Sequence, residues 1–272
     1  MGKKLRNLIK FIGALLFWWV VITASWVALL GIAKAPVTFT MIQQRLEQGT
    51  IQRANKSLEE IARPLPLAII ASEDQRFMTH HGFSTEQIKR SLGMKEPGFS
   101  LLEFVQSVAK KDPARTTKRG KRTKGASTIS QQTAKNVFLW PGRSMTRKGL
   151  EAWFTVLIET LWTKQRILEV YLNVAEMGKG VFGAEAAARH CFGKSASRLV
   201  TSEAAIIAAT LPAPRRFSCT SPSGYLRGRQ QWILRQMSNV GDVLDPEVLA
   251  KRKAKLEAEE RREAERRAKR RK

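Results

Sequence analysis

The stretch that decides the fold is Gly125–Asn136, which reads GASTISQQTAKN. It opens with small and hydroxyl-bearing residues, which favour the N-terminal cap of a helix. In the helix that follows, Gln131 lies one turn before Lys135. Gln132 lies one turn before Asn136 in the same way. A segment with three amides and an ammonium group suits the hydroxyl, amide or phosphate groups of a ligand and does not suit a core. The segment therefore predicts a helix that carries binding residues.

A second polar cluster lies upstream, in Ala71–Phe83, which reads ASEDQRFMTHHGF. It follows the apolar run Leu67–Ala71, so Glu73 and Asp74 end a segment that we expect to be buried. Burial raises the pKa of a carboxyl group, as a general base requires. An acidic pair at a helix end is also typical of a cap or a surface ion pair, and the residues alone leave both interpretations open.

A third cluster lies downstream, in Arg143–Glu151, which reads RSMTRKGLE. Arg147 precedes Glu151 by four residues and Lys148 precedes it by three, which also fits a salt bridge within one helix. Arginine and lysine are the side chains that bind phosphate groups best. Four cations within 14 residues of sequence are candidates to bind a diphosphate: Lys135, Arg143, Arg147 and Lys148.

The N-terminal region has the composition of a membrane anchor. Phe11–Ala33 contains 23 consecutive residues without a charge, long enough to cross a hydrocarbon core of about 30 Å as a helix. Four cations precede it, which keeps the N-terminus in the cytoplasm and exports the rest of the chain: Lys3, Lys4, Arg6 and Lys10. A cleavable signal peptide has a shorter apolar region, and a core helix is seldom apolar on every face.

The net charge of +25 is concentrated in two segments. The tail Lys251–Lys272 has 12 Lys and Arg against 5 Glu, and we expect a solvated helix or a disordered tail in which nothing packs. Lys110–Lys124 has 8 Lys and Arg against one Asp and contains helix breakers, so it is predicted to be a loop. An anionic membrane surface is the expected partner, with solubility alone as the other interpretation. An exported domain does not normally meet nucleic acid.

Between anchor and tail, Ala35–Ala250 is predicted to form one mainly α domain with a looser section at Gly98–Lys124. Ser202–Leu211 and Tyr225–Val240 are among the expected helices. Two cysteines and three histidines exclude a zinc ribbon and a histidine-rich metal site. We expect the cysteines to be unpaired thiols, although an oxidising compartment permits a bridge: Cys191 and Cys219.

Four ordered motifs carry a resemblance to a known family. The first, E-D-x-x-F-x-x-H-x-G, is matched by Glu73–Gly82, and the second, G-x-S-T-I-x-Q-Q-x-x-K-N, by Gly125–Asn136. The third, R-K-x-x-E, is Arg147–Glu151, and the fourth, K-x-x-I-L-E-x-Y-L-N, is Lys164–Asn173. Together they are far more specific than any one alone. The chain resembles the monofunctional biosynthetic peptidoglycan transglycosylases, which are similar to the glycosyltransferase half of class A penicillin-binding proteins.

The resemblance implies a lysozyme-like helical glycosyltransferase domain with a small mobile lobe near the membrane. It implies an inverting enzyme that polymerises lipid II into β-1,4 glycan strands and releases undecaprenyl diphosphate, in cell-wall biogenesis and the maintenance of cell shape. Glu73 is then the catalytic base and Glu151 the second catalytic carboxylate. The implied substrate-binding residues come from the second and third motifs and the segment between them: Ser127, Thr128, Gln131, Gln132, Lys135, Asn136, Arg143, Arg147 and Lys148.

The resemblance also implies partners and a location. The partners are lipid II, the nascent glycan strand, the bacterial inner membrane and cell-wall synthesis proteins, with no nucleic acid. No cofactor is firmly implied, and a divalent cation, Mg or Mn, held by Glu151 against the diphosphate stays open. Residues 1–10 are a cytoplasmic segment, 11–33 a single transmembrane helix, 35–250 a periplasmic catalytic domain and 251–272 a charged tail.

Three other functions explain the sequence less well. A lysozyme-like hydrolase or lytic transglycosylase would share the fold and a glutamate, but it uses a protonated acid and has no need of four cations. A membrane-tethered scaffold leaves the three polar clusters unexplained. A penicillin-binding transpeptidase is excluded, because Ser107–Lys110 fits S-x-x-K but no K-T-G or S-x-N partner occurs.

Overall fold

Two helices that are apolar on nearly every side form the centre of the molecule. They are α3 (Pro64–Glu73) and α10 (Thr201–Thr210), and a helix of this kind is stable only when protein surrounds it. Ile69 and Ile207 are completely buried in them. Both helices pack against α11 (Gly224–Val240). The expected helices at 202–211 and 225–240 are thus confirmed.

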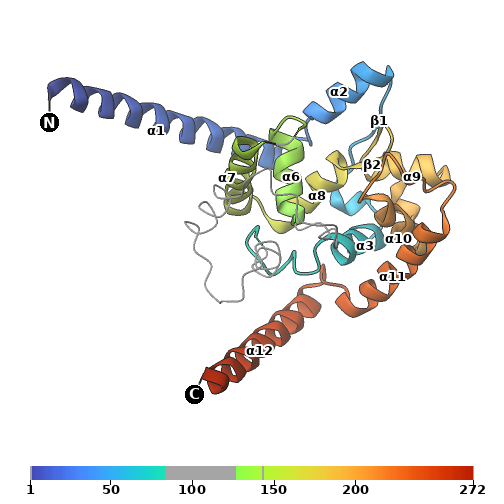
Figure 1. Ribbon diagram of the computed structural model, residues 1–272. Coiled ribbons are helices and arrows are strands. Elements are labelled where there is room, and N and C mark those ends of the chain that lie inside the picture. The colour runs from blue at the N-terminus through green and yellow to red at the C-terminus, as the bar shows by residue number, and fades with distance from the viewer. Residues whose placement is uncertain (1, 84–126, 143, 272) are drawn as a thin grey trace, which may run out of the picture.

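The computed structural model describes residues 2–83, 127–142 and 144–271 (Figure 1). The looser section at 98–124, the basic loop 110–124 and Arg143 lie outside the described residues, as does most of the segment between the first two motifs, where the mobile lobe was expected. Within the described part, helices dominate, which confirms the predicted class.

Three helices lie on one side of this centre and carry most of the motifs: α6 (Ile129–Phe138), α7 (Met145–Leu161) and α8 (Lys164–Val174). A hydroxyl residue caps each of them, because a side-chain oxygen accepts a hydrogen bond from a first-turn backbone N–H that has no partner in the helix. These caps are Thr128, Ser144 and Thr163.

A small sheet lies beside α8. Its strands are β1 (Gln52–Arg53), β2 (Glu176–Gly178) and β3 (Val181–Phe182), in the order β1-β3-β2. β1 runs parallel to β3 and β2 antiparallel to it. The helix α9 (Ala184–Phe192) follows β3, and short 3-10 helices occur at Leu58–Glu60 and Ala196–Arg198. Strands of two or three residues are too short for an alternating pattern, so the sequence did not reveal them.

The helix α1 (Lys3–Ile32) projects from the molecule, and its C-terminal end lies against α7 (Figure 1). Within the described residues it is the one helix that is long and apolar enough to cross a membrane. Trp19 stacks on Trp153 of α7, with ring centroids 4.8 Å apart. The indole N–H of Trp162 donates to the carbonyl of Val27 at 2.8 Å. The short helix α2 (Phe39–Gln48) follows α1.

The charged tail is a helix, α12 (Pro246–Arg271), which begins five residues before the predicted boundary. The expectation that nothing in the tail packs is wrong at its base. Arg252 donates to the carbonyls of Asn239 and Val240 at 3.1 Å each, and Leu256 is half-buried. The last carbonyls of a helix such as α11 lack partners within the helix, so they attract an arginine.

The prediction of two unpaired thiols is also wrong. Cys191, near the end of α9, forms a disulfide with Cys219 in the loop before α11, with Cα atoms 5.5 Å apart. The chain leaves α9, passes through α10 and returns beside α9, which brings together two cysteines 28 residues apart. That return depends on the tertiary path of the chain and leaves no local pattern.

Candidate active site

Glu73 ends α3 and points from the core toward α6. Its side chain is 16% exposed, and burial raises the pKa of its carboxyl group. Two neighbours act in the opposite direction. Gln132 donates from Nε2 to Oε2 at 3.1 Å, and a guanidinium nitrogen of Arg229 lies 3.6 Å from Oε1. The carboxyl group is therefore desolvated, as a proton-transfer group requires, while an amide and a cation favour its ionised form.

Asp74, the next residue, has a structural role. Its Oδ2 accepts hydrogen bonds from the backbone N–H of Ile129 at 3.1 Å and from Nε2 of His80 at 2.8 Å. Nδ1 of His80 accepts from the backbone N–H of Gly82 at 3.1 Å, which places the imidazole proton on Nε2. Asp74 thus joins the end of α3 to the start of α6. The acidic pair was expected to be either desolvated or a cap or surface ion pair. Both carboxyl groups are largely removed from solvent, and Asp74 additionally connects two helices through its hydrogen bonds.

The start of α6 is held by a capping box. Gln131 donates its backbone N–H to Oγ1 of Thr128 at 3.1 Å, and Thr128 donates its own N–H to Oε1 of Gln131 at 3.0 Å. The Thr128 hydroxyl donates to the carbonyl of Gly82 at 2.7 Å. Both side chains are buried. These two predicted substrate-binding residues therefore fix the start of the helix, and neither lines the pocket formed by the described residues.

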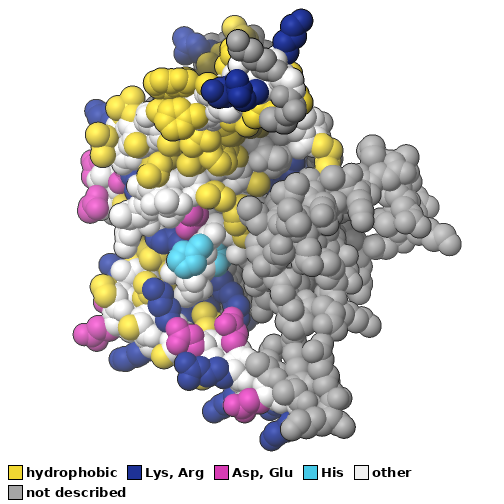
Figure 2. Space-filling view, turned by 90° about the vertical axis from the view of Figure 1, so that its left-hand side faces the viewer, with side chains coloured by type: hydrophobic (Ala, Val, Ile, Leu, Met, Phe, Trp, Pro, Cys, Tyr) yellow, Lys and Arg dark blue, Asp and Glu magenta, His cyan; other side chains and the backbone are white. Residues whose placement is uncertain are grey.

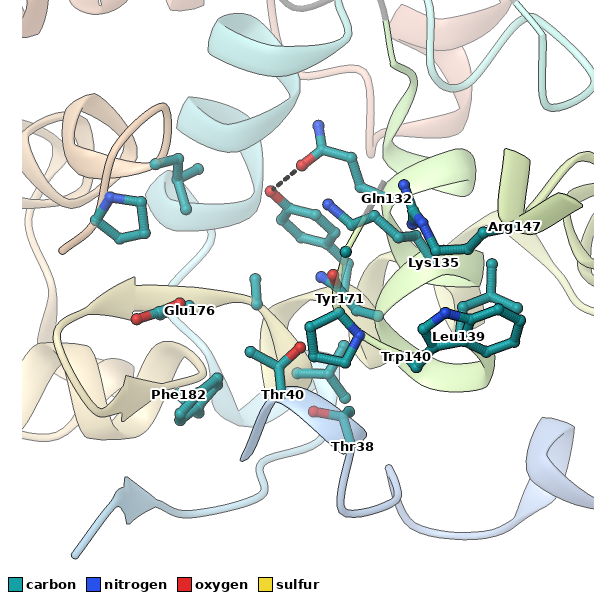
Figure 3. Close-up of a pocket in the computed structure, with 17 residues that line it drawn as sticks. Thr38, Thr40, Gln132, Lys135, Leu139, Trp140, Arg147, Tyr171, Glu176 and Phe182 are labelled. Atoms are coloured by element: carbon teal, nitrogen blue, oxygen red, sulfur yellow. Dashed lines mark hydrogen bonds between the residues drawn. The ribbon is translucent and has the colours of Figure 1, made fainter. Parts of the chain in front are cut away.

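The next residue on α6, Gln132, faces a pocket of about 370 Å³ between α6, α8 and the small sheet (Figure 3). The hydroxyl of Tyr171 on α8 donates to Oε1 of Gln132 at 3.4 Å, drawn as the dashed line in Figure 3. Burial, and then the charge of Glu73, raise the pKa of Tyr171 well above its ordinary value, so the phenol keeps its proton. Gln132 thus accepts from Tyr171 and donates to Glu73.

A group of cations lines one end of this pocket. Figure 3 shows Lys135 and Arg147 side by side there, with Glu176 at the opposite end. Burial lowers the pKa of Lys135, and the charges of Arg147 and Lys148 lower it further, whereas Glu151 raises it. Nε of Arg147 is buried without a hydrogen-bond partner among the described residues. The crowding of like charges favours an anion at this end of the pocket.

Glu151 is the carboxylate that lies next to these cations. It is 3% exposed, forms an ion pair with Lys148, and has Oε2 at 3.8 Å from Arg147. A buried carboxylate with such partners holds the two cations in place. The salt bridge within α7 that the spacing allowed is therefore present, and it lies at the pocket.

Comparison with known proteins shows the family of this chain. A family model described as Transglycosylase matches residues 39–238. The chain belongs to the transglycosylase family. It is 44% identical over 243 residues to the biosynthetic peptidoglycan transglycosylase of Pseudomonas aeruginosa, covering 87% of this chain and 95% of that one. It is 45% identical over 219 residues to the protein of the same name from Xanthomonas campestris, covering 78% and 80%. The predicted family and its lysozyme-like helical fold are confirmed.

The structure of this transglycosylase brings together part of the predicted site. Gln132, Lys135, Asn136 and Arg147 line the pocket, and Glu73 and Glu151 contact them. Lys148 does not line the pocket; it forms an ion pair with Glu151, which in turn lies near Arg147. Ser127 is half-buried, and its carbonyl accepts from Gln132 at 3.4 Å.

Sequence reasoning missed Arg229 on α11. It lies one turn before Ile233, which is completely buried, so its side chain starts from the inward face of the helix. A single arginine on the inward face of a helix is a signal that could have marked it. Glu176 at the far end of the pocket was also missed. It pairs with Arg215, whose Nε lies 2.9 and 3.2 Å from its two carboxylate oxygens.

Among the residues that the structure describes, the side chains around the pocket do not form a metal site. In the described ranges no three His, Cys, Asp or Glu side chains gather in a group that could hold an ion. Glu151, the carboxylate among the cations, already has Lys148 at one oxygen and Arg147 near the other. We derive no step through a metal.

Proposed function

We propose that this transglycosylase polymerises lipid II into β-1,4 glycan strands, inverting the anomeric carbon and releasing undecaprenyl diphosphate. The observation that carries the proposal is the pairing of a desolvated carboxylate with a cation cluster. Gln132, which contacts Glu73, and Lys135, which belongs to the cluster, lie one turn apart on α6. Peptidoglycan appears in the names of the relatives, and polymerising it from a lipid diphosphate needs both groups.

In this mechanism Glu73 is the base. The 4-hydroxyl of the acceptor sugar attacks the anomeric carbon of the growing chain and gives its proton to the Glu73 carboxylate. A carbon–oxygen bond forms on one face of the sugar while the bond to the diphosphate breaks on the other. The electron pair of that bond leaves with the diphosphate oxygen, so the centre is inverted.

The cations stabilise the charge that develops on the leaving diphosphate. Preorganised cations in a site of low dielectric lower the free energy of a transition state more than they would in water. We assign this role to Lys135, Arg147 and Lys148, which the structure describes, and to Arg143, which lies outside the described residues. Glu151 keeps the Arg147 and Lys148 side chains in position.

A hydrolase of the lysozyme type is the second candidate, because the raised pKa of Glu73 also suits a general acid. Its leaving group is a sugar hydroxyl, which carries no diphosphate and does not need the cation cluster. Arg229 and Gln132 both favour the ionised form of Glu73, as a base requires. These contacts favour the synthase.

For the membrane arrangement, we propose a single-pass protein of the bacterial inner membrane. Residues 1–10 face the cytoplasm, 11–33 span the bilayer, 35–250 form the periplasmic domain and 251–272 the tail. The disulfide between Cys191 and Cys219 supports a location of the catalytic domain outside the cytoplasm, because disulfides persist in oxidising compartments. Lipid II never leaves the bilayer, so a tethered enzyme meets it in two dimensions. Cell-wall synthesis proteins remain predicted partners.

The test is to give the detergent-solubilised protein fluorescent lipid II and, separately, preformed peptidoglycan, and to resolve the products by size. We expect glycan polymer from lipid II and no cleavage of peptidoglycan. Cleavage without polymer would contradict the proposal and indicate the hydrolase. Inactivity in both assays would also contradict it.

A further inference from the structure

The helix α12 carries a stripe of cations along one side. Five Lys and Arg side chains recur at spacings of three, four and seven residues, which places them on one face of a helix. All five are exposed, and none forms an ion pair with another residue that the structure describes. We call them the α12 stripe: Lys251, Lys255, Arg262, Arg266 and Lys269.

A different face of α12 docks on the domain. Leu249 packs against the core, Arg252 binds the last carbonyls of α11, and Glu260 forms an ion pair with Arg76 at 3.1 Å. These residues, with Leu256 between them, follow their own helical spacing of three and four. Because α12 is fixed along this docking face, the stripe is held pointing away from it and into solvent.

The free ends of α12 and of the membrane-spanning helix α1 lie on the same side of the molecule. In Figure 1 the N-terminus of α1 and the C-terminus of α12 both project toward the left. Figure 2 views this side directly, with apolar side chains gathered in its upper part and Lys and Arg mixed with Asp and Glu in its lower part, where α12 lies. A bilayer that surrounds α1 therefore approaches the outer part of α12.

We propose that the α12 stripe binds the phosphate groups of anionic phospholipids in the bilayer that holds α1. The stripe has the charge that such headgroups attract, and nearby cations add favourably to binding at an anionic surface. α12 has no apolar face to insert between acyl chains, so it lies at the headgroup level. The contact would orient the pocket relative to the membrane and is sensitive to salt. The inference rests on the proposed membrane anchor and not on the polymerase reaction.

The test uses the full chain in nanodiscs, with a fluorophore on α12. Ala258 lies one turn after Lys255 and is exposed. Because Cys191 and Cys219 pair with each other, Ala258→Cys supplies the single free thiol for labelling. We compare quenching by a headgroup-labelled lipid in neutral phosphatidylcholine discs and in discs that also contain phosphatidylglycerol. The proposal predicts stronger quenching with phosphatidylglycerol and its loss at high salt.

Two matched variants decide the cause. The stripe variant combines Lys255→Gln, Arg262→Gln, Arg266→Gln and Lys269→Gln, and glutamine preserves the helix. The control variant removes four exposed cations elsewhere, with the same change in net charge: Lys179→Gln, Arg198→Gln, Arg227→Gln and Arg235→Gln. We expect the stripe variant alone to lose the lipid-dependent quenching. Removing four cations should weaken the binding of α12 to the anionic surface by about tenfold or more.

Equal quenching in neutral and anionic discs would overturn the proposal. So would equal losses in the two variants, because net charge alone would then explain them. The measurement needs no lipid II, so it can succeed while the proposed reaction fails. A chain that does not enter nanodiscs would contradict the anchor and, with it, this inference.

Discussion

At the residue scale, Arg229 is one of the groups that favour the ionised form of Glu73. Burial raises the pKa of Glu73, and the cation of Arg229 works against it from 3.6 Å. In Arg229→Gln that opposition is lost, so the pKa of Glu73 rises further. A base acts only when ionised, and we therefore expect the acidic limb of the pH profile of kcat/KM to move to higher pH. The measurement is the rate of lipid II polymerisation against pH.

The matched control for that experiment is Arg235→Gln, an exposed arginine on the same helix. It should leave the limb where it is in the parent enzyme. An unmoved limb in Arg229→Gln would show that the cation does not act on the ionisation of Glu73.

Residue types could be predicted more easily than residue roles. The helix presenting amides and a lysine was correctly inferred, yet Gln131 completes the cap of α6 while its neighbour Gln132 faces Glu73. Gln131 is buried in the cap, and Gln132 is positioned by Tyr171, so the difference between the two amides depends on tertiary contacts. Sequence spacing predicts which residues share a helical face, but it does not predict which residues of other elements they contact.

At the element scale, α1 packs on the folded domain as well as having the length and composition of a membrane anchor. Its last turns pack on α7 and on Trp162, and a guanidinium nitrogen of Arg166 donates to the carbonyl of Leu30 at 2.8 Å. The helix α7 carries the third motif. The contact therefore links the membrane helix to the element that positions Arg147 and Glu151.

Two glycines of α1 test this contact. A Cβ atom at Gly31 would lie 3.0 Å from the ring of Trp162, whereas one at Gly13 would meet nothing within 4 Å. Gly31→Val should destabilise the protein by about 1–3 kcal/mol through overpacking, because Trp162 is buried and hydrogen-bonded. Gly13→Val raises the hydropathy of α1 equally and should have no such effect. The measurement is thermal unfolding in detergent, and equal behaviour of the two variants would contradict the docking.

The disulfide ties α9 to the loop that leads past the pocket. Leu211 and Pro214 of this loop line the pocket, and Cys219 holds the loop to α9. Cys191→Ser removes a disulfide that joins residues 28 positions apart in the sequence. This loss should lower the free energy of unfolding by about 3 kcal/mol. Thermal unfolding measures this loss. Maleimide labelling of the denatured, unreduced protein should find one free thiol in the variant and none in the parent, and a labelled parent would contradict the pairing.

Elements differ in how far the sequence predicts them. Long periodic segments such as Tyr225–Val240 predicted helices correctly, because helical hydrogen bonds and caps are local. The strands β1 and β3 pair residues more than a hundred positions apart and leave no local pattern. The disulfide was missed for the same reason.

At the scale of the whole molecule, the motif residues of the site come from four separate parts of the chain, and a fifth part completes it. Glu73 comes from α3, Gln132 and Lys135 from α6, Glu151 from α7 and Tyr171 from α8. The order of the motifs predicted that these parts belong to one family fold. The completing residue Arg229 comes from α11, outside the four motifs, so only the folded structure places it beside Glu73.

The measurement that tests the central claim most directly compares lipid II polymerisation by the parent enzyme and Glu73→Gln at neutral pH. Loss of a general base should reduce the rate by about 100-fold or more. Burial raises the pKa of Glu73 in the folded state, so its ionised form opposes folding at neutral pH, and the uncharged glutamine should leave thermal stability unchanged or higher. Glu59→Gln, an exposed carboxylate, is the control and should polymerise as the parent does. A stable Glu73→Gln variant that still makes polymer at the parent rate would contradict the account.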